Sequence, residues 1–291
     1  MSAFVRFLLV ILVIGILMAL FGGLSFSLKG EKDFRDGNIA VIEIDGIISE
    51  SLPVLEQIQK ASEEDSYRAI ILRVNSPGGA VGASQEIYME LRRLREKKPI
   101  VVSMGDIAGS GGLYVALGGS HLIALPGTIT GSMGVLVQLT NISRLLNKVL
   151  VDPLTIRSGD LKDAGNPMRP FDPRARQLFE DLIQTNFKTF RKTVAAERKL
   201  KPDAVATLSD GRIVSGEEAL TLGLVDSLGT FQDAVLKAKD LGHITEKIEL
   251  AYLSRKPESW TDLFMSSLWR PLREEIRSIL HSSTKAYYLG L

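Results

Sequence analysis

The chain has 291 residues, and its 35 Lys and Arg residues are balanced by 34 Asp and Glu residues. A net charge this close to zero gives no indication of nucleic-acid binding. The sequence contains no cysteine, which excludes disulfides, a thiol nucleophile and thiolate metal ligands. Hydrophobic residues make up 45% of the chain, enough for a substantial buried core.

An apolar segment lies near the start of the sequence. Residues 7–28 carry no charge and are almost all hydrophobic, which suffices for a bilayer-spanning helix of about 20 residues. A cleaved signal peptide is the alternative, but it needs a shorter apolar region and a small-x-small site, which Leu20 and Phe21 fit poorly. We therefore predict an uncleaved anchor over residues 1–28, followed by a polar linker over residues 29–38. More basic residues follow the segment than precede it, which weakly favours a cytoplasmic body.

Apolar runs alternate with helix-like segments beyond the linker. Buried strands are predicted at residues 39–48, 69–74, 100–104 and 122–125. Apolar residues at helical spacing predict helices over residues 51–62 and 84–97. Such alternation is typical of an α/β fold with parallel strands.

The second half of the chain is predicted to be mainly helical. Asp172 followed by Pro173 is an N-cap with proline in the first turn, and the helix that follows extends over residues 174–200. A short strand is expected before it, at Leu154–Ile156.

Two more helices and an amphipathic tail complete the prediction. A capping box at residues 215–218 begins a helix that ends at Gly223, and residues 231–241 form another helix. The aromatic-rich tail from residue 259 onward is expected to be a packing helix, with contact to a membrane or a partner as the alternative.

Ser110 is the candidate nucleophile. It lies among Gly109, Gly111 and Gly112, in the segment that follows the end of the third predicted strand at Met104. The Gly111 N–H could stabilise an oxyanion, and so could a backbone amide of the NSPGG segment that contains Gly79. Each glycine-rich segment taken alone is equally consistent with an ordinary turn.

A serine needs a group that accepts its proton. His121 is expected at a strand edge, and His243 and His281 lie in segments without a supporting motif. Lys162, in a glycine- and proline-bounded loop, is the other candidate. As a base it would need its pKa lowered by about 3 units from about 10.4, which burial can provide. A solvated surface lysine remains the alternative.

Several ordered motifs together resemble the signal peptide peptidase A family, which are membrane-anchored serine-lysine peptidases with a Clp/crotonase-like fold. The motifs are NSPGG, DIAGSGGLY, PGTITGSMGV, SGDLKD and DGRIVSGEEALTLGLVD, and the match as a whole covers residues 39–241. The resemblance implies an α/β Clp/crotonase-like ββα superhelix over residues 39–242. An extension with the amphipathic tail then covers residues 243–291.

The resemblance also implies a role for each matching residue. Ser110 corresponds to the nucleophile, Lys162 to the general base, and Gly79 and Gly111 to the oxyanion donors. Ser132, in TGSMG, corresponds to the hydroxyl that orients the lysine. No metal or organic cofactor is expected.

The implied activity is endoproteolysis of cleaved signal peptides and other apolar peptides at the membrane. The family resemblance implies a ring-like homo-oligomer that completes each dyad between protomers, and a catalytic domain outside the cytoplasm. This orientation opposes the charge count around the anchor. Three alternatives remain: an acyl-CoA enzyme of the same fold, a non-catalytic membrane scaffold, and a peptidase with a Ser-His-Asp triad that uses His121.

Overall fold

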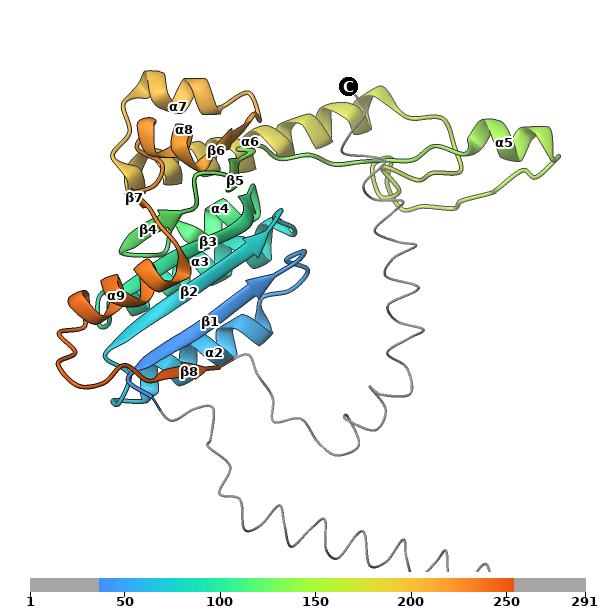
Figure 1. The fold of residues 1–291 in the computed structure, drawn as a ribbon. Helices are drawn as coiled ribbons and strands as arrows, with labels where there is room; N and C mark the ends of the chain where they lie inside the picture. Colours follow the sequence, from blue (N-terminus) through green and yellow to red (C-terminus); the bar gives the residue numbers. More distant parts are fainter. Residues whose placement is uncertain (1–36, 254–291) are drawn as a thin grey trace, which may run out of the picture. The chain divides into compact units, whose positions relative to one another are not determined.

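A computed structural model describes residues 37–253 (Figure 1). The predicted anchor (residues 1–28), most of the linker and the C-terminal tail lie outside the described residues. Within residues 37–253, no helix combines the length and the apolar character needed to cross a bilayer.

Eight strands form one sheet within this region, in the order β6-β5-β3-β2-β1-β8, with β4 beside β3 and β7 beside β4. All neighbouring strands are parallel except β5 and β6. The strands are β1 (Ile39–Asp45), β2 (Ala69–Ser76), β3 (Ile100–Gly109), β4 (His121–Ala124), β5 (Ile129–Gly131), β6 (Ile213–Ser215), β7 (Ser227–Leu228) and β8 (Leu250–Tyr252). The predicted α/β fold with parallel strands is therefore confirmed.

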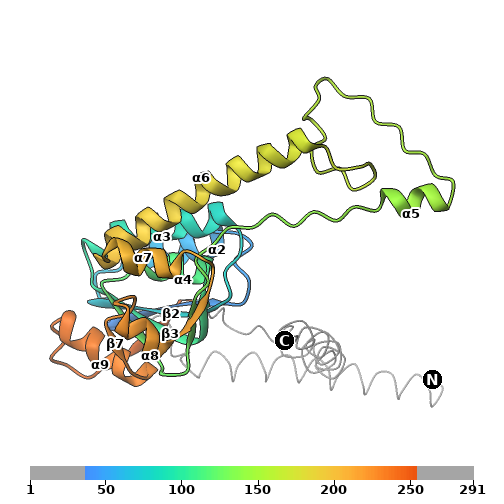
Figure 2. The same ribbon diagram turned by 90° about the horizontal axis from the view of Figure 1, so that it is seen from above.

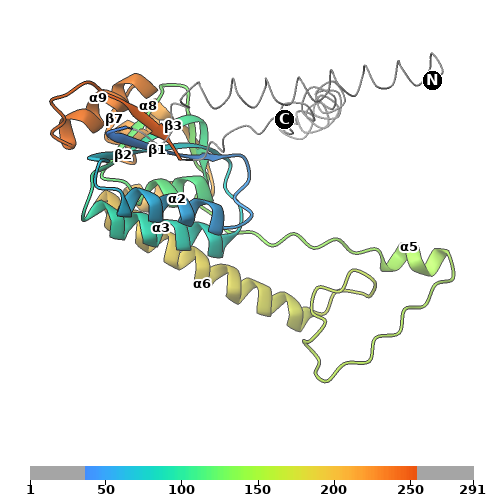
Figure 3. The ribbon, with the colours of Figure 1, turned by 90° about the horizontal axis from the view of Figure 1, so that it is seen from below.

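The helices lie on both faces of the sheet (Figure 3). They are α2 (Leu52–Glu63), α3 (Val81–Arg95), α4 (Gly111–Ala116), α5 (Ser143–Lys148), α6 (Pro173–Arg198), α7 (Pro202–Leu208), α8 (Gly216–Thr221) and α9 (Phe231–Leu241). The sequence predicted α2, α3, α6, α8 and α9 but not α5 or α7. Asp172 caps α6 as expected, because its carboxylate accepts a hydrogen bond from the Arg174 N–H at 2.8 Å.

The central strands are buried on both faces because helices cover both. Alternate residues of β1 belong to two separate clusters of buried side chains: Ala40 and Ile42 face α2, α3 and α4, whereas Ile39 and Val41 face α9. Strands covered in this way read as continuous apolar runs in the sequence. The two packed faces fix the C-terminal ends of β2 and β3, where the candidate residues lie.

A long excursion leaves the sheet after β5. We call residues 134–172 the arm; it carries α5 and returns to the start of α6, and all views show α5 well separated from β1, β2 and β3 (Figures 1, 2 and 3). The strand predicted at Leu154–Ile156 is wrong, because this segment pairs with no strand of residues 37–253. Leu154 and Ile156 are 88% and 92% exposed.

Candidate active site

Ser110 occupies the junction between β3 and α4 in a strained backbone conformation. Its φ of 52° and ψ of −118° lie in a region that L-residues rarely adopt. The Ser110 N–H donates to the Gly131 carbonyl of β5 at 2.9 Å, and its carbonyl accepts from the Tyr114 N–H at 2.9 Å. The flanking strand and helix hold the residue in this conformation, which costs about 1–3 kcal/mol and occurs preferentially at functional sites.

Two backbone amides lie next to one another beside Ser110. A methyl group on Gly111 would lie 3.1 Å from the Gly79 nitrogen, and one on Gly78 would lie 2.6 Å from the Gly111 nitrogen. The Gly79 N–H makes no backbone hydrogen bond within residues 37–253. Gly111 is the first residue of α4, so its N–H has no acceptor within the helix. Paired free amides of this kind can stabilise an oxyanion.

The Gly79 loop is fixed by a short parallel bridge to Ile48. The Ile48 N–H donates to the Gly78 carbonyl at 2.9 Å, and the Ala80 N–H donates to the Ile48 carbonyl at 2.7 Å. A methyl group on Gly79 would lie only 2.1 Å from the Ile48 carbonyl oxygen. Glycine is therefore required here for close packing, while the positive φ of 107° at Gly78 demands glycine for conformational reasons.

Ser132 lies beside the nucleophile at the end of β5. It also has a positive φ of 49°, and its N–H donates to the Arg212 carbonyl at 2.7 Å. Its Cβ would lie 3.7 Å from a methyl group on Gly109, the residue before Ser110. Ser110 and Ser132 both line the same cavity.

This cavity has a volume of about 590 Å³ and is bounded by Gly79, Ser110, the root of the arm and α6. Apolar side chains form most of its wall, namely Val81, Met133, Val135, Leu136, Ile183 and Phe187. A smaller adjoining cavity reaches Gly111 and Tyr114. The sequence reasoning missed Ile183 and Phe187, although their four-residue spacing places both on one face of α6. The cavity can accept an extended apolar chain next to the hydroxyl of Ser110.

Lys162 is not part of this constellation in the single chain. It lies in a turn of the arm, it is exposed, and it lines neither cavity next to Ser110. Its ammonium makes no hydrogen bond or ion pair with another residue of the range 37–253. The structure therefore brings together Gly79, Ser110, Gly111 and Ser132, and leaves Lys162 on a separate segment.

His121 lies at the opposite end of β3. It pairs in register with Val101, and at about 3.3 Å per residue the strand separates it from Ser110 by about 30 Å. Its Nε2 is 3.1 Å from the Ser227 Oγ, and its Nδ1 is 3.9 Å from an Asp226 carboxylate oxygen. Burial lowers the pKa of His121, and the Asp226 charge opposes that shift only in part. This geometry does not support a triad of His121 with Ser110.

His243 lines neither cavity next to Ser110. His243 follows the end of α9, and His281 lies outside the described residues. Within residues 37–253, no group of three or more His, Asp or Glu side chains is arranged to hold a metal ion.

A strained serine at a strand-to-helix junction, next to two free amides and an apolar cavity, defines a hydrolase-type site on a parallel sheet. Residues 92–245 match the family model described as peptidase family S49, and residues 40–130 match the model described as Clp protease. The chain belongs to peptidase family S49, a family of serine-protease hydrolases.

Named relatives agree with this assignment. The chain is 44% identical over 215 residues to the Synechocystis sp. protein slr0021, covering 73% of this chain and 77% of that one. It is 35% identical to Protease 4 of Salmonella typhi, covering 86% of this chain and 41% of that protein. It is 34% identical to the chloroplastic serine protease SPPA of Arabidopsis thaliana, covering 75% and 32% respectively. The match thus spans under half the length of the two larger relatives.

Proposed function

We propose that the protein is a serine endopeptidase in which Ser110 is the nucleophile and Lys162 the general base. The observation that carries the proposal is the conformation of Ser110, fixed between the two free amides of Gly79 and Gly111 at the wall of an apolar cavity. Strained backbone conformations persist only where the surrounding structure holds them, and they cluster at active sites.

The proposed reaction uses these groups in the following steps. Neutral Lys162 accepts the Ser110 proton while the serine oxygen attacks a peptide carbonyl carbon. The Gly79 and Gly111 N–H groups donate hydrogen bonds to the resulting oxyanion. The protonated lysine then gives its proton to the leaving amine, and a water molecule hydrolyses the acyl-enzyme. We assign to Ser132, which lines the cavity beside Ser110, the orientation of the lysine.

We further propose that a neighbouring copy supplies the lysine in a ring-like homo-oligomer. Two features support this arrangement. Lys162 is remote from the cavity within its own chain, and the arm exposes large apolar side chains, with Leu136, Leu150 and Leu154 at 81%, 94% and 88% exposure. Exposed apolar surface of this extent is typical of a protein interface. Burial in that interface would also provide the apolar surroundings that a neutral lysine requires.

The substrates we propose are cleaved signal peptides and other apolar peptides close to a membrane. The apolar wall of the cavity suits such chains, and the uncharged segment over residues 7–28 supports a single-pass anchor. We propose a catalytic domain outside the cytoplasm from the family resemblance, against the charge count around the anchor. Protease digestion of intact spheroplasts checks the orientation, because an external domain is degraded before lysis.

Subunit mixing tests the dyad directly. Ser110→Ala and Lys162→Met are each expected to abolish hydrolysis of a casein or signal-peptide substrate, and co-expression of the two inactive chains is expected to restore part of it. Restoration requires a serine from one chain and a lysine from another. Lys192→Met, a control on α6 outside the cavity, should leave the activity unchanged. Full activity in Lys162→Met would overturn the assignment of the base.

A further inference from the structure

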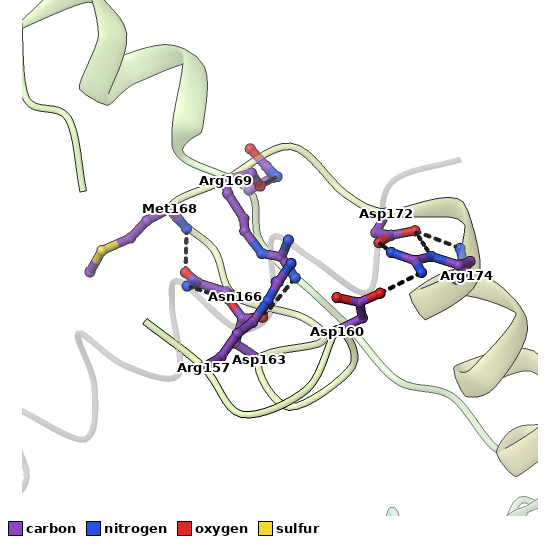
Figure 4. Close-up of polar contacts among 9 residues, drawn as sticks. Arg157, Asp160, Asp163, Asn166, Met168, Arg169, Asp172 and Arg174 are labelled. Carbon is purple, nitrogen blue, oxygen red and sulfur yellow. Dashed lines mark hydrogen bonds and ion pairs between the residues drawn. The ribbon is translucent and has the colours of Figure 1, made fainter. Parts of the chain in front are cut away.

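The turn that carries Lys162 is surrounded by charged pairs. Consecutive turn hydrogen bonds run from the Lys162 N–H to the Gly159 carbonyl and from the Ala164 N–H to the Leu161 carbonyl, each at 3.1 Å. Asp160 precedes the lysine and Asp163 follows it, and both carboxylates are directed toward arginine side chains (Figure 4).

Asp163 lies at the centre of one group of contacts, which we call the Asp163 cluster (Arg157, Asp163, Asn166 and Arg169). One Asp163 oxygen accepts from Arg157 at 2.5 Å and from Arg169 at 2.8 Å, and the other accepts from Asn166 at 3.3 Å. The Asp163 side chain is only 14% exposed. The hydrogen bond from Arg157, together with the charges of both arginines, lowers the pKa of Asp163, so the carboxylate stays ionised.

A second group ties the same turn to α6. Arg174 donates to Asp160 at 2.8 Å and to Asp172 at 3.0 Å, and Asp172 is also the N-cap of α6. The turn is therefore joined at both of its carboxylates to residues that precede or begin the long helix (Figure 4).

The charges of these two groups cancel. Arg157, Arg169 and Arg174 balance Asp160, Asp163 and Asp172. The neighbouring α6 residues near the turn, Arg176 and Glu180, pair with each other at 3.4 Å, and residues 137–141 bring no charge. Among the described residues, Lys162 thus lies in a turn whose two carboxylates, Asp160 and Asp163, are already paired with arginines.

We propose that Asp163 is a positioning residue for Lys162: its cluster with Arg157 and Arg169 fixes the turn and prevents the neighbouring carboxylate from holding the lysine in its charged form. The proposal rests on the proposed function of Lys162 as the base. An unpaired carboxylate one residue away would stabilise the ammonium, because an opposite charge within about 4–6 Å typically raises a lysine pKa by one unit or more. The arginines remove that effect and keep the loop in one conformation.

The pH dependence of Ser110 acylation by a fluorophosphonate probe tests this proposal in the full-length protein. Arg157→Gln leaves an excess negative charge beside Lys162 and is expected to move the midpoint of the labelling profile upward by about one unit. Asp163→Asn leaves excess positive charge and should move the midpoint downward, with a lower maximum rate because the turn is no longer fixed. Arg157→Lys keeps the charge and should retain the wild-type midpoint. Arg93→Gln, which breaks an exposed ion pair with Glu90 on α3, is the matched control.

The outcomes separate this inference from the proposed function. Opposite shifts in Arg157→Gln and Asp163→Asn support the positioning role, since a purely structural role would lower labelling at every pH without moving the midpoint. Equal midpoints of the labelling profile in all variants would overturn the positioning role of Asp163. If labelling is still abolished in Lys162→Met, the assignment of the lysine as base stands. Wild-type labelling in Lys162→Met overturns both. If Arg157→Gln fails to fold, a midpoint shift in Asp163→Asn alone decides the result.

Discussion

The β3–α4 junction and the Lys162 turn of the arm are stabilised in opposite ways. At the junction, backbone atoms are packed so closely that Gly78 and Gly79 tolerate no side chain, and the buried strands hold Ser110 in a strained conformation. At the arm, side-chain ion pairs fix an exposed turn that packs little apolar surface. Under the function proposed above, the fold of one chain preforms the proposed nucleophile and oxyanion donors, whereas charge pairs and a second copy would place the proposed base.

The largest effect is expected at the strained serine. Ser110→Gly should reduce peptide hydrolysis by about 10⁴-fold or more, because the nucleophile is lost. The same change should raise the free energy of unfolding by about 1 kcal/mol, since glycine adopts the positive φ without strain. Hydrolysis assays and urea denaturation measure the two effects. Ser110→Ala is the control, because it removes the hydroxyl but keeps the strained Cβ; equal stability of the two variants would show that the junction stores no strain.

The second-largest effect is expected from the close packing of the Gly79 loop against Ile48. Gly79→Ala forces a methyl group to within 2.1 Å of the Ile48 carbonyl oxygen. We expect the free energy of unfolding to fall by about 3 kcal/mol, and activity to fall by about 10²-fold or more as the amide moves. Gly82→Ala is the matched control, because no atom lies within 4 Å of the added methyl group. A Gly79→Ala protein with wild-type stability and activity would contradict the rigid junction.

Local signals in the sequence predicted most of the junction. Uninterrupted apolar runs predict buried parallel strands, and glycines flanking Ser110 mark a place where backbone atoms meet. The sequence could not show that the Gly79 and Gly111 amides are neighbours, because this depends on the register of β2 against β3, which shifts after Val74. The motif resemblance supplied that assignment instead.

The arm was predicted less well for a physical reason. Residues 154–156, which include the β-branched Thr155 and Ile156, favour a strand, but a strand forms only with a partner, and residues 37–253 provide none. The side-chain cap at Thr230 was missed as well, although Thr230 and Asp233 form the reciprocal capping box of α9. At Ser215 the hydroxyl accepts from the Glu218 N–H, which is one of the two hydrogen bonds of the predicted capping box. A strand that needs a distant partner cannot be predicted from its own residues, whereas the capping box of α9 is a local signal that the sequence does contain.

An intermediate effect, on stability, is expected where side chains of α3 hold α6 through Glu197. Glu197 of α6 accepts hydrogen bonds from Tyr88 at 2.5 Å and from Arg95 at 2.7 Å, and Tyr88 packs edge-on against Tyr114 of α4. Glu197→Gln should lower the free energy of unfolding at neutral pH by about 2 kcal/mol, a typical value for hydrogen bonds to a charged group.

This loss should depend on pH. Burial alone raises the pKa of Glu197, but the hydrogen bonds from Tyr88 and Arg95 outweigh it, and the net pKa is lowered. The Glu197 contribution is therefore present above the unfolded pKa of about 4.3 and is lost as the pH falls through the folded value. Denaturation series for wild type and Glu197→Gln should converge in acid. Glu180→Gln, in an exposed pair with Arg176, should cost less than about 0.5 kcal/mol at any pH.

The smallest effect on activity is expected at His121. This variant tests whether the chain holds its own base for Ser110. His121→Ala should change hydrolysis by less than about two-fold, because β3 places the ring about 30 Å from Ser110. Its effect should appear in stability instead. Burial lowers the pKa of His121, so the folded wild type resists protonation and loses stability as the pH falls below the unfolded value of about 6.5. His121→Ala should remove that part of the acid sensitivity in denaturation experiments between pH 7 and pH 5. Loss of hydrolysis in this variant, with folding intact, would mean that His121 is the base. The assignment of Lys162 as the general base would then be wrong.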